Sequence, residues 1–155
     1  MGFYNDNRGN QKPRDGRSNS TKGDIETAAD KCFSELTYSS KWIKEGADEA
    51  LITFAEKAGK FMAKNNLTNS KIRSIYGEIK RIQMGDFKKE KASFYLLKPK
   101  VAYAFGRDEK NEGLKLFKKI FDICSTDVND QETYHNFCNL IEAILAYHKA
   151  HGGKD

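Results

Sequence analysis

The sequence has little proline, few cysteines and no long apolar run, and each shortage excludes a class of protein. Its 155 residues include two prolines, Pro13 and Pro99, which leaves long stretches free to form helices. The three cysteines are odd in number and lack CxxC spacing, so we expect reduced thiols in a cytoplasmic protein. No segment approaches ~18 consecutive apolar residues, and the opening MGFYNDNRGNQ is polar. We therefore expect neither a membrane span nor a signal peptide.

The sequence also lacks the motifs of common catalytic and nucleotide-binding sites. It contains no P-loop and no GxGxxG, HExxH or GxSxG pattern. One metal-like set exists, because His135, Cys138 and Glu142 stand at i, i+3 and i+7 of a helical segment. However, Cys138 belongs to the apolar stripe of that segment, where thiols usually only pack. The sequence therefore predicts no enzyme, no cofactor and no bound metal.

What the sequence does contain is helical periodicity, with apolar residues recurring at three- and four-residue spacing. We predict an all-α fold, a compact bundle of five to six helices in one domain over residues 24–150. Residues 1–23 are basic and poor in apolar side chains, so we expect a disordered tail. The expected helices are 24–36, 41–65, 67–85, 86–105 with a break or kink at Pro99, 113–124 and 131–148.

The segment LTNSKIRSIYGEIKRI, residues 67–82, has an apolar face and a basic face. Arg73 and Lys80 are seven residues apart, so they should project nearly in line, two turns from each other. Gly77 lies between them, at a cost of ~1 kcal/mol relative to alanine in mid-helix. This glycine predicts a close approach by another helix or by an RNA backbone.

The net charge of +5 and the sequence pI of about 9.0 favour an anionic partner. If residues 67–82 pack beside residues 94–107, their cations can form one strip that neutralises phosphates, with Tyr76 and Tyr103 as stacking surfaces. The strip could equally be a solvated face or meet an acidic protein, and Arg107 could instead serve the turn as a cap or ion-pair partner. The candidate RNA-binding residues are Lys64, Lys71, Arg73, Lys80, Arg81, Lys98, Lys100 and Arg107.

Three motifs occur in an order and spacing that match a known family. The segment at 67–82 is followed by FYLLKPKVAYAFGR at 94–107 and by FCNLIEAILAYHK at 137–149. Together they resemble the small helical subunit of type III-A CRISPR–Cas interference complexes, the Csm small subunit. The resemblance covers residues 67–149, whereas residues 24–66 match only as a helical region of suitable length.

This resemblance implies a non-catalytic RNA-binding subunit in antiviral defence. Several copies would stack head to tail along a guide RNA, with their basic surface beside the guide RNA–target RNA duplex. The implied partners are both RNAs, neighbouring copies, and the backbone and large subunits that carry the nuclease and cyclase activities, with no membrane. The alternative is a helical protein–protein interaction module without direct RNA contact.

Overall fold

The computed structural model describes residues 25–155, and the predicted tail at 1–23 lies outside the described residues. This part of the chain contains helices and no strands, which confirms the all-α prediction. In chain order the helices are α1 (Ala28–Glu35), α2 (Lys41–Lys44), α3 (Glu49–Lys64), α4 (Asn69–Gln83), α5 (Phe87–Gly106), α6 (Glu112–Ser125) and α7 (Gln131–Ala150).

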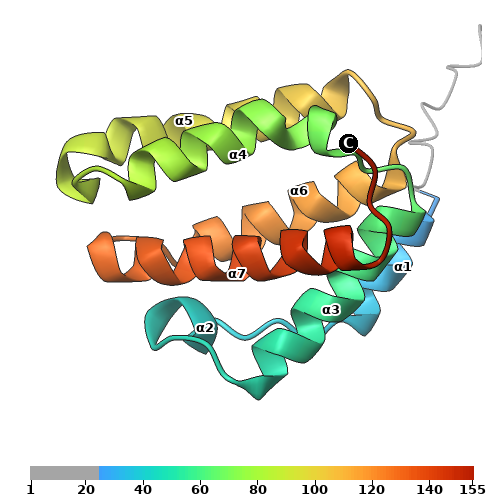
Figure 1. The fold of residues 1–155 in the computed structure, drawn as a ribbon, viewed down its shortest axis with the longest axis horizontal. Helices are drawn as coiled ribbons and strands as arrows, with labels where there is room; N and C mark the ends of the chain where they lie inside the picture. The colour runs from blue at the N-terminus through green and yellow to red at the C-terminus, as the bar shows by residue number, and fades with distance from the viewer. Residues whose placement is uncertain (1–24) are drawn as a thin grey trace, which may run out of the picture.

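The helices lie in three layers (Figure 1). Helices α4 and α5 pack side by side in one outer layer, α6 and α7 form the middle, and α1, α2 and α3 form the other outer layer. The two loops at 65–68 and 107–111 meet at one end of the bundle, which we call the loop end. Asn111 Nδ2 donates to the Asn66 carbonyl at 2.8 Å, and the Gly113 amide donates to the Asn65 carbonyl at 2.8 Å. The ends of α3 and α5 are thereby held beside the starts of α4 and α6.

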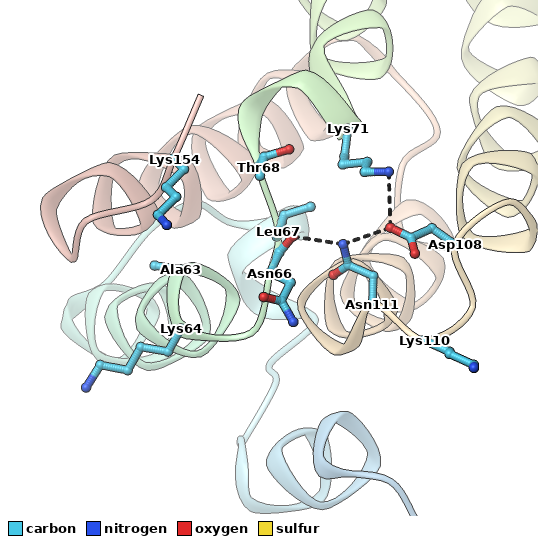
Figure 2. Close-up of a pocket in the computed structure, with 10 residues that line it drawn as sticks. All are labelled: Ala63, Lys64, Asn66, Leu67, Thr68, Lys71, Asp108, Lys110, Asn111 and Lys154. Atoms are coloured by element: carbon cyan, nitrogen blue, oxygen red, sulfur yellow. Dashed lines mark hydrogen bonds and ion pairs between the residues drawn. The ribbon is translucent and has the colours of Figure 1, made fainter.

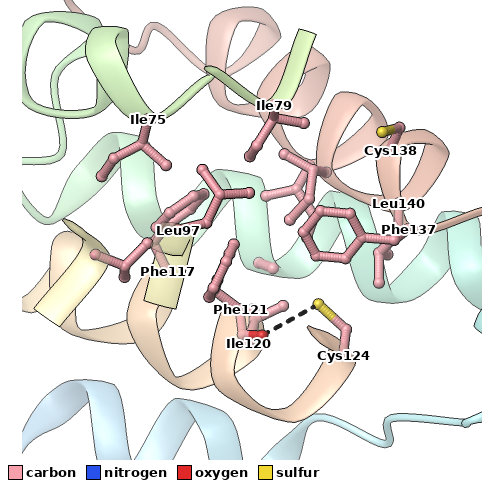
Figure 3. Close-up of a cluster of buried hydrophobic side chains, with 14 of the residues drawn as sticks. Ile75, Ile79, Leu97, Phe117, Ile120, Phe121, Cys124, Phe137, Cys138 and Leu140 are labelled. Atoms are coloured by element: carbon pink, nitrogen blue, oxygen red, sulfur yellow. Dashed lines mark hydrogen bonds between the residues drawn. The ribbon is translucent and has the colours of Figure 1, made fainter. Parts of the chain in front are cut away.

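Buried side chains gather where α5, α6 and α7 meet (Figure 3). Phe137 of α7 is fully buried there, with ring centroids 6.0 Å from Phe94 of α5 and 5.6 Å from Phe121 of α6. Tyr134 stacks beside it at 5.8 Å, and its hydroxyl donates to the Ile79 carbonyl of α4 at 2.6 Å. One buried aromatic cluster therefore fixes the middle layer against the α4–α5 layer.

The single helix predicted over residues 41–65 is wrong, because the chain turns between α2 and α3. Gly46 adopts φ +119°, a left-handed conformation that favours glycine. Asp48 then caps α3 by accepting the Leu51 amide at 2.9 Å, and it also accepts the Trp42 indole N–H at 2.7 Å. Gly46 and Asp48 thus divide the segment into α2 and α3, which adds one helix to the predicted bundle.

The predicted break at Pro99 is also wrong, because α5 runs unbroken from Phe87 to Gly106. Proline removes the amide that would bond the carbonyl of Tyr95, four residues earlier. Both residues lie on the exposed side of α5, where water can satisfy that carbonyl. Leu97 and Val101 are fully buried, so packing keeps the chain helical on both sides of Pro99.

Two glycines of the bundle have opposite surroundings. A Cβ on Gly59 of α3 would lie 2.6 Å from the Ile144 carbonyl oxygen and 2.7 Å from the His148 amide nitrogen of α7. A Cβ on Gly77 of α4 would have no neighbour within 4 Å. Close packing of α3 on α7 therefore requires Gly59, whereas no packing within the described residues requires Gly77.

Candidate nucleic-acid interface

A groove of about 720 Å³ runs between the first half of α4 and the second half of α5. It brings together three of the predicted cations, Lys71 from α4 with Lys100 and Arg107 from α5. Its wall includes two apolar side chains that stay exposed, Leu96 at 57% and Tyr103 at 67%. A basic groove with an exposed aromatic ring has the features of a nucleic-acid backbone site.

Arg107 and Tyr103 form one unit at the end of α5. The guanidinium lies over the phenol ring, 5.7 Å from its centroid, as expected for residues four apart on a helix. The cap of α5 is made by the Arg107 backbone amide, which donates to the carbonyls of Phe105 and Tyr103. Among residues 25–155 the Arg107 side chain has no ion-pair partner; it is exposed and contacts the Tyr103 ring.

Lys71 is held in place by Asp108, which follows α5. Their side chains approach to 3.2 Å, and Asn111 Nδ2 donates to the same carboxylate at 3.1 Å (Figure 2). The hydrogen bond from Asn111 and the charge of Lys71 lower the pKa of Asp108, so it stays ionised at neutral pH. Among the residues that the structure describes, Asp108 is the one acidic side chain that lines the groove, and it reduces the positive charge there.

A second hollow, of about 580 Å³, adjoins the groove at the loop end and shares Lys71 and Asp108 with it. Figure 2 shows its lining, in which Lys64 and Lys110 extend away from the bundle. Lys154 reaches it because the Asn69 amide donates to the Lys154 carbonyl at 2.9 Å, which fixes the last residues beside α4. Four lysines therefore surround this hollow: Lys64, Lys71, Lys110 and Lys154.

Arg73 and Lys80 lie on the other side of α4, facing α7 rather than the groove. Lys80 forms an ion pair with Glu142 of α7, which raises the pKa of the lysine. The hydrogen bond from Asn69, followed by the charges of Lys149 and Arg73, lowers the pKa of Asp155 beside α7. The predicted strip is thus divided between two sides of α4, and the groove lies on its α5 side.

The Arg81 side chain forms ion pairs with two carboxylates, so its role is structural. Its guanidinium contacts Glu78 of α4 at 2.8 Å and Glu90 of α5 at 3.0 Å. These contacts raise the pKa of Arg81, with Glu78 as the larger cause. The ion pair with Glu90 joins α4 to α5 at the end of the groove away from Tyr103, whereas the one with Glu78 lies within α4. Lys98 is exposed on α5 but lines none of the hollows described here.

Lys110 and Lys154 were not predicted from the sequence, because each reaches the interface through tertiary contacts. Lys110 belongs to the loop fixed by Asn111, and Lys154 follows the last helix. Lys57 and Lys60 were not predicted either. With Lys64 they stand at i, i+3 and i+7 of α3, and this spacing does predict one basic face.

Within residues 25–155, no three metal-ligating side chains are grouped to hold an ion. Glu142, considered above as a possible ligand, is instead paired with Lys80. None of the helices in this part of the chain is both long and apolar enough to span a bilayer.

The fold and the site define a small all-helical protein whose main surface feature is a basic groove with an exposed aromatic ring. The family model described as Csm2 Type III-A matches residues 45–154, and the chain belongs to this family of small subunits of type III-A CRISPR–Cas complexes. It is also similar to the "CRISPR system Cms protein Csm2" of Streptococcus thermophilus, with 29% identity over 120 residues, covering 70% of this chain and 96% of that protein. No solved structure matches the chain.

Proposed function

We propose that this chain is a non-catalytic RNA-binding subunit whose α4–α5 groove contacts the phosphate backbone of RNA. The observation that supports this most strongly is the convergence of Lys71, Lys100 and Arg107 around the exposed ring of Tyr103. In the cytoplasm, several copies would lie along the guide RNA–target RNA duplex, in contact with each other and with the backbone and large subunits of the complex.

The chemistry of the groove suits binding without sequence preference. Ammonium and guanidinium groups contact phosphate oxygens, which carry no sequence information. The Tyr103 ring offers a flat apolar surface to a ribose or a base of any kind. A few such contacts per copy give weak binding, and repetition of copies on one strand multiplies it.

The double substitution Lys100→Ala with Arg107→Ala is expected to weaken RNA binding about tenfold at moderate salt. Two phosphate contacts are lost, so the slope of log affinity against log salt should fall by roughly 0.7 per contact on single-stranded RNA. Fluorescence anisotropy with labelled RNA at several salt concentrations measures both quantities. Both residues are exposed, so the fold should be retained.

The matched control is Lys88→Ala with Lys89→Ala, two exposed lysines in the first turn of the same helix. This control should bind RNA as the parent does. Asp108→Asn should act in the opposite direction and raise affinity, because it removes the acidic side chain of the groove and releases Lys71. If the double variant keeps full RNA affinity but no longer joins the complex, the chain is an interaction module without direct RNA contact.

A further inference from the structure

The α4–α5 groove is one part of a longer basic surface. A third hollow of about 400 Å³ lies between α1 and α3, lined on its α3 side by Lys57, Lys60 and Lys64. It shares Lys64 with the hollow at the loop end, which in turn shares Lys71 with the α4–α5 groove. We call this connected surface the basic track; its cations are Lys57, Lys60, Lys64, Lys71, Lys100, Arg107, Lys110 and Lys154.

The basic track is strongly positive. Among residues 25–155, eight basic side chains line it, against two acidic ones, Glu35 and Asp108. Of these eight, only Lys71 has an ion-pair partner in the described part of the chain. The track therefore offers cations whose attraction to an anion is not already satisfied by the other described residues.

The lysines of α6 differ from those of the basic track. Lys115 and Lys119 both pair with Asp30 of α1, at 2.9 and 2.8 Å, and Lys118 pairs with Asp122 at 2.6 Å. These cations are neutralised within the fold, although the sequence presents them as a basic face.

The track has a fixed framework over its whole length. Lys57, Lys60 and Lys64 project from one face of a 16-residue helix. Further along, Lys154 is placed by its carbonyl bond to the Asn69 amide, and by Gly153, which is buried against the ring of His148. An anionic partner therefore meets a preorganised row of charges, which lowers the entropic cost of binding.

The path of the basic track over the surface favours a single-stranded partner over a double-stranded one. It begins between α1 and α3 in one outer layer, crosses the loop end, and continues between α4 and α5 in the other outer layer (Figure 1). A double helix is too stiff to turn around one end of a 17.6 kDa protein, since the persistence length of duplex DNA is about 50 nm. A single strand follows such a path, and its phosphates and bases suit lysines beside partly buried apolar groups such as Phe61 and Leu36.

We infer that the α1–α3 end of the basic track binds a single-stranded RNA segment that continues beyond the part held in the α4–α5 groove. This inference rests on the proposed function, because it extends the same RNA contact to a second surface. The groove then holds one part of the RNA, and Lys57 and Lys60 hold the phosphates of an unpaired part on the opposite layer.

The test compares oligouridylates of about 6 and about 16 nucleotides, which are short and long relative to usual single-strand sites. Charge reversal by Lys57→Glu with Lys60→Glu should lower affinity for the long strand about tenfold and leave the short strand unchanged. A short RNA duplex should also bind the variant as it binds the parent. Lys57→Gln with Lys60→Gln should give a smaller loss in the same direction, and Lys88→Glu with Lys89→Glu is the charge-matched control.

Circular dichroism on all variants establishes that the helical content is retained, as expected for exposed side chains. Equal affinity of parent and Lys57/Lys60 variants for the long strand would overturn the inference, and so would an equal loss on long strand and duplex. If Lys100→Ala with Arg107→Ala still weakens the short strand in that case, the proposed function stands alone. If the parent binds neither strand but binds the duplex, the inference is wrong and the proposed function stands, and if it binds none of the three RNAs, both proposals are wrong.

Discussion

Gly59→Val is expected to lower the free energy of unfolding by about 3 kcal/mol or more. Any side chain at this position must enter the contact between α3 and α7, where a Cβ would lie 2.6 Å from a carbonyl oxygen and 2.7 Å from an amide nitrogen of α7. Helix backbone cannot yield as a flexible side chain can, so the two helices must separate. Urea denaturation followed by far-ultraviolet circular dichroism measures the loss.

The control is Gly77→Ala, which should raise the free energy of unfolding by roughly 0.5–1 kcal/mol. Gly77 lies in the interior of α4, and a Cβ there would have open space around it. The alanine side chain therefore makes no clash, and it reduces the conformational entropy of the unfolded chain. If Gly77→Ala preserves stability but weakens RNA binding, then an external partner approaches α4 closely at Gly77, as the sequence analysis predicted. Equal stability of Gly59→Val and the parent would show that α3 does not pack on α7 as described.

Phe137→Ala is expected to cost about 3–5 kcal/mol of stability, the range for removal of a buried aromatic side chain. The residue is fully buried and contacts aromatic rings on α5 and α6 as well as on its own helix. Its removal leaves a cavity at the meeting point of three helices, which cannot all move inward to fill it. The same denaturation experiment reports the change.

Tyr95→Ala is the matched comparison, because Tyr95 also contacts Phe94 but is 59% exposed. This substitution should lower the free energy of unfolding by about 1 kcal/mol or less, since little apolar surface is removed from the core. A loss at Tyr95 as large as that at Phe137 would contradict the position of the core between α5, α6 and α7.

The sequence predicted the fold class and most helices because apolar periodicity is a local property of the chain. The two errors arose where local rules compete with packing. At residues 45–48 the turn depends on the conformation of Gly46 and on the double use of Asp48, and apolar spacing continues across both. At Pro99 the local rule predicts a helix break, but the burial of Leu97 and Val101 keeps α5 continuous.

The sequence predicted the candidate site less well, because charge pairing depends on neighbours distant in the chain. Helical phase placed Lys80 and Arg81 on a basic face, but Glu142 and Glu90 neutralise them through contacts between helices. Helical phase equally could not show that the groove would collect Lys71, Lys100 and Arg107, since that requires the register of α4 against α5. Whether any of these cations binds RNA stays a prediction.

The position of Trp42 makes folding and binding separable by optical spectroscopy. It is the one tryptophan of the sequence, 2% exposed, with its indole fixed on Asp48 at the start of α3. Lys64, at the other end of that helix, lies ~24 Å from Asp48 by the helical rise. Intrinsic emission from Trp42 should therefore shift when the chain unfolds and stay constant when a short RNA fills the α4–α5 groove alone. One sample can then report both events, with tryptophan emission for the fold and a dye on the RNA for occupancy.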